Sequence, residues 1–162
     1  MSTAFEVSRE TTIHVRDHCL CLHAQRAART LARRFDEAFR PLGLTNGQFS
    51  LMMSLNRPEP PTMGNAAEFL AMDRTTLTAA LKSLARRGLV EVIRNPRDRR
   101  SRVMRLTSSG RALLARAVPI WLETHAEVER LLADGEAERL RGSLNRLSRA
   151  SVGAAGEPSD PA

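Results

Sequence analysis

The stretch DRTTLTAALKSLARRGLVEVIRNPRDRRSRVMRL, residues 73–106, decides the fold. Its first half predicts a helix that begins after Asp73, a residue type that caps helix N-termini well, and that stops at Gly88. At about 100° per residue, one side of this helix is apolar. That side carries Leu77, Leu81 and Leu84. The opposite side is short, polar and basic, so it faces either water or a polar partner.

The second half of the stretch changes from a helical to an extended pattern. Residues 89–94 and 102–106 predict two strands, and residues 95–101 predict the hairpin turn between them. Five arginines crowd into this hairpin, namely Arg94, Arg97, Arg99, Arg100 and Arg102. They repel one another unless a polyanion is nearby. We expect Asp98, the one opposing charge, to pair with an arginine and fix the shape of the tip.

Three helices are predicted on the N-terminal side of this region. Apolar residues spaced by three and four predict a long helix over 14–39. Thr45 and Gln48 have the spacing of a capping box before a second helix. Thr62 caps a short third helix, which we expect to bury Ala66, Phe69 and Leu70.

Two more helices are predicted on the C-terminal side. Thr107 caps a long helix to about Leu132, which Pro119 is expected to kink, and residues 136–148 form the last helix. The expected buried positions of the long helix are Leu113, Leu114, Val118, Trp121, Val128 and Leu131. The long helices carry more apolar surface than a small domain can cover, which predicts a dimer interface.

The predicted fold class is therefore mainly α with a small β-hairpin wing, a winged helix-turn-helix with long N- and C-terminal dimerisation helices. We expect a flexible N-terminus over 1–12, a single folded chain over 13–150 and a disordered tail over 151–162. Within the folded chain, residues 13–43 and 107–150 are the dimerisation helices, and 44–106 are the winged helix-turn-helix.

The overall charge favours a polyanionic partner. Lysine and arginine outnumber aspartate and glutamate by 25 to 18, which suits nucleic acid or an anionic membrane surface. No apolar run approaches the roughly 20 residues of a membrane span, and the polar N-terminus is not a signal peptide. Two cysteines do not make a disulfide framework, so we expect a cytoplasmic protein that does not bind membranes.

The candidate DNA-binding residues lie on the 73–88 helix and on the hairpin. Short threonines let a helix approach base edges closely, and arginine and lysine reach guanines or phosphates. Arginine in a narrow minor groove can read the shape of DNA. The candidates are Arg74, Thr75, Thr76, Thr78, Lys82 and Arg86 on the helix, with Arg97, Asp98, Arg99 and Arg100 on the hairpin.

Several short motifs resemble the MarR family of bacterial regulators over roughly residues 15–148. They are Leu44-Thr45 with Gln48-Phe49, Met72–Thr78, Leu84–Val90, Asp98–Ser101 and Leu106–Arg111. The resemblance implies an obligate homodimer, joined through its first and last two helices, that binds a pseudo-palindromic operator and usually represses transcription. It also implies release by a small phenolic or aromatic effector or, in other members, by oxidation of a cysteine. The family's wing residues correspond to Asp98 and Arg100 here.

An effector pocket is expected between the first, second and fifth predicted helices. Its candidate lining residues are His23, Arg26, Met52 and Trp121. Arg26 could hold a carboxylate. The alternative is that these four residues belong to the dimer interface or to the surface.

The segment around Cys19 and Cys21 is a candidate redox site. A helix N-terminus and nearby basic residues lower the pKa of a thiol, but free cysteines are often inert buried groups. The peroxide-sensing members that the chain resembles also use tyrosines, and this chain has none. Residues two apart on a helix splay outward, so a Cys/His metal site with His18 and His23 is disfavoured, and no metal or cofactor is expected.

The expected function is that of a sequence-specific, double-stranded DNA-binding transcriptional regulator, a homodimeric repressor released by a small effector. Two alternatives stay open: a redox-sensing regulator of the same fold that uses Cys21 or Cys19, and a winged helix that binds protein. The basic hairpin argues against a protein-binding module. An enzyme is not expected, because the sequence has no phosphate-binding glycine loop, H-E-x-x-H or G-x-S-x-G motif.

Overall fold

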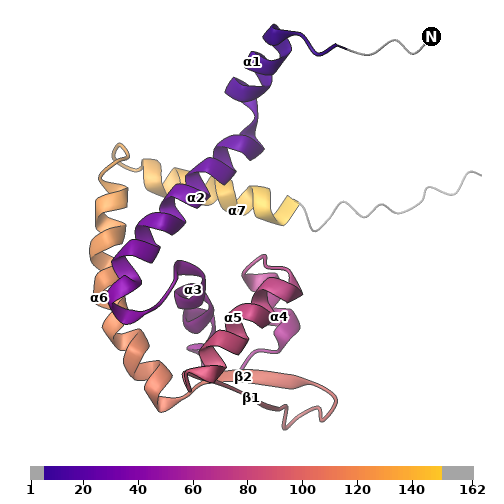
Figure 1. Ribbon diagram of the computed structural model, residues 1–162, viewed down its shortest axis with the longest axis vertical. Coiled ribbons are helices and arrows are strands. Elements are labelled where there is room, and N and C mark those ends of the chain that lie inside the picture. The colour runs from indigo at the N-terminus through magenta and orange to yellow at the C-terminus, as the bar shows by residue number, and fades with distance from the viewer. Residues whose placement is uncertain (1–5, 151–162) are drawn as a thin grey trace, which may run out of the picture.

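The computed structural model describes residues 6–150, and the expected tail over 151–162 lies outside them. The chain is mainly helical, with one two-stranded hairpin (Figure 1). The elements in chain order are α1 (Arg9–His18), α2 (Leu20–Phe39), the short 3-10 helix η1 (Arg40–Leu42), α3 (Asn46–Leu55), α4 (Met63–Phe69), α5 (Arg74–Arg86), β1 (Val90–Arg94), β2 (Arg102–Leu106), α6 (Ser108–Glu129) and α7 (Glu136–Ala150).

The predicted winged helix-turn-helix is confirmed. Helices α3, α4 and α5 pack around one core with the antiparallel strands β1 and β2. The strands pair in register from Val90 opposite Leu106 to Arg94 opposite Arg102. An isolated bridge from Thr62 to Val103 ties the segment before α4 to the hairpin. The largest fully buried side chains of the core are Phe39, Leu51, Met52, Leu77, Leu84 and Met104.

Four predicted helix caps are also confirmed. The Thr45 hydroxyl accepts a bond from the Gln48 amide (3.2 Å), and the Gln48 side chain accepts one from the Thr45 amide (3.1 Å). The side chains of Thr62, Asp73 and Thr107 each accept a bond from the amide three residues later, at 3.2, 2.8 and 3.0 Å. These bonds satisfy amides that the helix itself leaves free, so they fix where each helix starts.

The first predicted helix is corrected, because it is two helices with a break at Cys19. The Cys19 backbone is extended (φ −72°, ψ 102°), and its Sγ accepts a bond from the Leu22 amide (3.4 Å), which caps α2. Helix α1 already begins at Arg9, since the Ser8 hydroxyl accepts a bond from the Thr11 amide (3.1 Å). Residues 9–12, expected to be flexible, are therefore helical.

Two expectations of burial are wrong in the described chain. Phe69, expected to be buried by α4, is 74% exposed, and Leu131, after the end of α6, is 71% exposed. Helix α6 runs as one helix through Pro119. None of the helices within residues 6–150 combines the length and the hydropathy that a membrane span requires.

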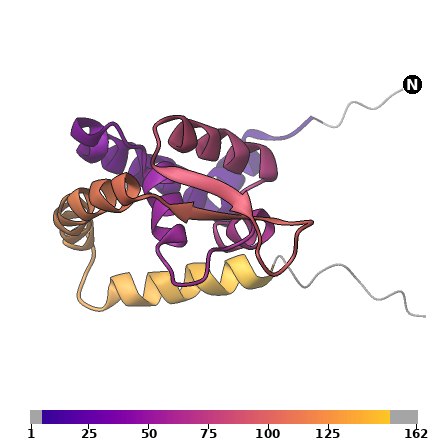
Figure 2. The ribbon, with the colours of Figure 1, turned by 90° about the horizontal axis from the view of Figure 1, so that it is seen from below.

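The outer helices leave apolar side chains uncovered. Helix α1 projects away from the body, and α7 forms a separate layer on one side of it (Figures 1 and 2). Helix α2 packs on α6, where Arg34 pairs with Glu127 at 2.7 Å. The exposed side chains on α1 and α7 include Ile13, Val15, Leu140, Leu144 and Leu147.

Candidate nucleic-acid interface and adjoining cleft

Helix α5 has one buried side and one exposed side, as its sequence predicted. Leu77 and Leu84 are fully buried and Leu81 is nearly so, which fixes the rotation of the helix against the core. The candidate contact residues Arg74, Thr75, Thr76, Thr78, Lys82 and Arg86 are all exposed. The side of α5 that could contact a polyanion therefore does not pack against the core.

The start of α5 is held by Asp73 and Thr76. The Thr76 amide donates to one carboxylate oxygen of Asp73 at 2.8 Å, and the Thr76 hydroxyl donates to the other at 2.6 Å. The bond from the Thr76 hydroxyl, and then the amide bond, hold the pKa of Asp73 below its ordinary value. The Thr76 hydroxyl is thus committed to the cap.

The other two threonines of α5 differ in how free their hydroxyls are. The Thr78 hydroxyl donates to the Arg74 carbonyl at 2.6 Å, and its oxygen can still accept a bond. For Thr75, no side-chain hydrogen bond is recorded within residues 6–150. Thr75 is therefore the threonine whose hydroxyl is free both to donate to and to accept from a partner.

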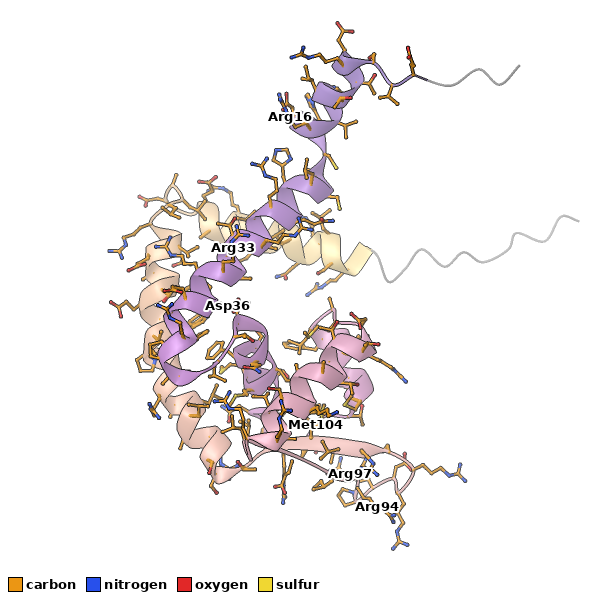
Figure 3. The ribbon with its side chains drawn as sticks, in the orientation of Figure 1. Arg16, Arg33, Asp36, Arg94, Arg97 and Met104 are labelled. Atoms are coloured by element: carbon orange, nitrogen blue, oxygen red, sulfur yellow. The ribbon has the colours of Figure 1, made fainter. Side chains whose placement is uncertain are left out.

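The hairpin turn is shaped by hydrogen bonds to its backbone. The Arg97 amide donates to the Asn95 side chain and the Arg100 amide donates to Asp98 Oδ1, both at 3.0 Å. The expected pairing of Asp98 with an arginine side chain is corrected, because its carboxylate faces the amide two residues later. Arg97 pairs instead with Glu59, on the loop after α3, at 3.0 Å. Figure 3 shows Arg97 and Arg94 at the wing, far from Arg33 on α2.

The wing concentrates positive charge at its exposed end. Arg94 and Arg102 lie directly opposite each other across the two strands, and like charges in that position are destabilising. Arg99 and Arg100 are exposed, and no acidic partner of either is recorded among the described residues. An anion bound at the wing would relieve this repulsion. The sequence showed that the arginines are many, and the register shows which of them face each other.

A cleft of about 640 Å³ lies between α3, the end of α4 and α6. We call it the apolar cleft; its walls include Phe49, Met53, Phe69, Val118, Trp121 and Leu122. The Trp121 ring is stacked with two others, at 6.5 Å from Phe49 and 4.5 Å from His125, measured between ring centroids. Such a cleft has the size and the character of a site for a small apolar molecule.

The four residues predicted to line an effector pocket do not come together in the chain. Trp121 lines the apolar cleft. The predicted place of Met52 in the pocket wall is corrected, because Met52 is fully buried in the core. Its neighbour Met53 lines the cleft instead. His23 and Arg26 are exposed on α2 and are not part of the cleft wall.

The two cysteines lie at the junction of α1 and α2 with different surroundings. Cys19 is half-buried and caps α2, whereas Cys21 is exposed and its Sγ accepts a bond from Gln25 Nε2 at 3.2 Å. The Nδ1 atoms of His18 and His23 are each 2.9 Å from a backbone carbonyl four residues earlier. Within residues 6–150, no group of three or more His, Cys, Asp or Glu side chains could hold a metal ion.

The proteins to which this chain is similar are transcriptional regulators. The MarR family model matches residues 44–101. A crystal structure of the Mycobacterium tuberculosis transcriptional regulator MosR in complex with DNA is 37% identical, with a TM-score of 0.76, over 86% of this chain and 100% of that one.

Two curated proteins are also similar. The transcriptional activatory protein BadR of Rhodopseudomonas palustris is 38% identical over 43% of this chain and 41% of its own length. The organic hydroperoxide resistance transcriptional regulator of Bacillus subtilis is 30% identical over 62% of this chain and 69% of its own length. The winged fold, the basic hairpin and these relatives lead to one assignment: the chain belongs to the MarR family of transcriptional regulators.

Proposed function

We propose that the protein is a sequence-specific regulator that binds double-stranded DNA as a homodimer and represses transcription. The observation that carries the proposal is the exposed face of α5 next to a hairpin crowded with arginines. A helix of this kind enters the major groove, and arginines of a wing lie along the minor groove or the phosphates. The DNA-bound state of MosR, a relative at 37% identity, supports the same reading.

The homodimer is supported by the uncovered side chains of α1 and α7. Leu140, Leu144 and Leu147 form a stripe along α7, and each is about half exposed. An apolar stripe of this kind marks an interface in soluble proteins. Two-fold symmetry would present two α5 helices to a pseudo-palindromic operator whose half-sites lie roughly 34–36 Å apart.

Release by a small aromatic or phenolic effector is supported by the apolar cleft. Its walls come from the winged domain (α3 and α4) on one side and from α6 on the other. A ligand that fills the cleft would therefore change how the winged domain sits on the long helix. In this proposal Met53, Phe69 and Trp121, which line the apolar cleft, contact the ring of the effector.

The test is fluorescence anisotropy with DNA from upstream of the protein's own gene and with scrambled DNA, across a salt series. We expect tighter binding to the upstream DNA and a steep loss of affinity with salt, because phosphate contacts release counterions. Equal, weak binding to both DNAs, with little effect of salt, would favour the alternative of a protein-binding winged helix.

Substitutions on the two parts of the interface should act differently. Arg99→Gln with Arg100→Gln should lower affinity for both DNAs by about tenfold and reduce the salt slope by about one to two. Thr75→Ala with Thr78→Ala should instead reduce the margin between upstream and scrambled DNA. Arg116→Gln, an exposed change on α6, is the matched control and should leave the affinity for upstream DNA unchanged.

A redox-sensing regulator is the second candidate, and the break at Cys19 favours it. The exposed Cys21 thiolate could attack a peroxide, cleave the O–O bond and become a sulfenic acid, with water or alcohol leaving. The same anisotropy assay tests this idea after treatment with peroxide. A loss of binding that reductant restores, and that Cys21→Ser abolishes, would support it; binding that survives peroxide would reject it.

A further inference from the structure

A second hollow lies beside the apolar cleft, at the base of the wing. Its volume is about 390 Å³, and it is lined by the loop after α3, by the end of β2 and by the start of α6. Each of these three segments contributes one arginine, namely Arg57, Arg105 and Arg111. We call this hollow the arginine cleft. Arg105 faces Glu91 near the open end of the hairpin, away from the turn over 95–101.

The arginine cleft has an excess of positive charge. Arg105 Nε donates to Glu91 at 2.6 Å, and Arg111 Nη1 donates to the Leu106 carbonyl at 2.9 Å. For Arg57, no hydrogen bond or ion pair of the side chain is recorded within residues 6–150. Three guanidinium groups thus share one recorded carboxylate. Planar guanidinium groups bind phosphate with paired hydrogen bonds, which makes phosphate the ligand that suits this charge.

The two clefts adjoin each other. Asn56 and Arg57 line both of them. A third, smaller hollow of about 190 Å³ has Met53 and Val118 in common with the apolar cleft and Arg111 in common with the arginine cleft. A single molecule could therefore extend from Trp121 to Arg57. Such a molecule needs an apolar body at one end and an anionic group at the other.

We propose that the arginine cleft binds the phosphate group of an effector whose apolar, aromatic body lies in the apolar cleft. The inference rests on the proposed function, in which the apolar cleft is the effector site. The chemical class of the effector is then an aryl or acyl compound that carries a phosphate, rather than a neutral phenol.

The position of the arginine cleft suits regulation. Arg57 is on the same loop as Glu59, which pairs with Arg97 of the wing. Pro58, Pro60 and Pro61 stiffen that loop, because each fixes its own backbone φ. A phosphate that draws Arg57 inward would thus act on the wing through a short and rigid connection.

The test is isothermal titration calorimetry of the full chain with 1-naphthyl phosphate, 1-naphthol and inorganic phosphate. We expect 1-naphthyl phosphate to bind about tenfold or more tightly than either of the other two compounds. Arg57→Gln with Arg105→Gln should remove this advantage. Arg105→Gln alone should reduce it and leave the affinity for 1-naphthol unchanged, because Arg105, unlike Arg57, does not line the apolar cleft. Arg116→Gln, an exposed arginine of α6 outside both clefts, should keep the advantage.

Several results would overturn the proposal. One is equal binding of 1-naphthyl phosphate and 1-naphthol, and another is an advantage that persists in the double variant. If the double variant also loses 1-naphthol binding, the single change Arg105→Gln decides in the same way, because Arg105 lines the arginine cleft and not the apolar cleft. Operator affinity of the wild type without ligand separates the two proposals: if the operator is not bound, the DNA-binding function is wrong, whereas the titration with 1-naphthyl phosphate still decides on the phosphate site.

Discussion

Gly110 shows how one residue fixes the junction between the hairpin and α6. A Cβ built on Gly110 would lie 2.0 Å from the carbonyl oxygen of Leu89, which accepts a bond from the Thr107 amide at 3.1 Å. We expect Gly110→Ala to lower the free energy of unfolding by about 1–3 kcal/mol, because backbone must move to make room. Urea denaturation measures this change.

Gly47 provides the matched control for that prediction. It also lies in a helix, but nothing is within 4 Å of a Cβ built there. Gly47→Ala should therefore raise the free energy of unfolding by about 0.5–1 kcal/mol, through the lower entropy of the unfolded chain. If both alanine variants gave the same change, the close approach of Gly110 to Leu89 would not be a constraint on the fold.

Single residues also show which features the sequence could predict. The caps at Thr45 and Thr107 were predictable because a cap is a local bond between residues three apart. The sequence could not predict which of Met52 and Met53 lines the apolar cleft. Both fit an apolar stripe, and only the packing of α3 against its neighbours decides that Met52 is in the core.

At the scale of the elements, the stability of the first turn of α5 depends on the ionisation of Asp73. The hydrogen bonds of Thr76 stabilise the carboxylate, so the pKa of Asp73 is lowered in the folded chain. A lowered pKa adds stability above the unfolded value of about 3.9, and this contribution is lost as the pH falls through the folded value. The stability difference between wild type and Asp73→Ala should therefore be constant above about pH 5 and should shrink toward pH 3.

Urea denaturation across that pH range measures the difference, and Asp73→Asn is the control. The amide oxygen of asparagine caps a helix without titrating. The difference between Asp73→Asn and Asp73→Ala should thus stay the same at every pH. If the wild-type difference were equally constant, the ionised form of Asp73 would not be what holds α5.

The first helix shows why an element can be misjudged from its pattern. No proline or glycine interrupts residues 14–39, so the sequence alone predicts one helix there. The break depends on the extended backbone of Cys19 and on a thiol that caps α2, and sulfur is not a usual cap. The Ser8 cap was missed for a different reason: the residues it precedes are polar, and α1 buries none of its side chains.

At the scale of the whole molecule, the apolar stripe on α7 is only half covered by the described chain. Leu140, Leu144 and Leu147 follow a helical spacing and remain 45%, 46% and 53% exposed. Next to these leucines, Arg141 of α7 forms two ion pairs. Its pair with Glu129 joins α7 to the end of α6, and its pair with Glu138 lies within α7. Arg141 thus ties α7 to α6 of its own chain, and in the proposed homodimer the leucines face the second chain.

Leu144→Asp should separate the proposed homodimer, because it buries a charge in the middle of the stripe without a partner. Sedimentation equilibrium should show a dimer for the wild type and a monomer for the variant. Operator affinity should fall by about a hundredfold or more, since the two half-sites would no longer be bound by linked subunits. Asn145→Asp adds the same charge one position away, off the stripe, and should remain a dimer. A dimeric Leu144→Asp protein with full operator affinity would place the interface elsewhere, and the exposed residues Ile13 and Val15 of α1 would be the next to test.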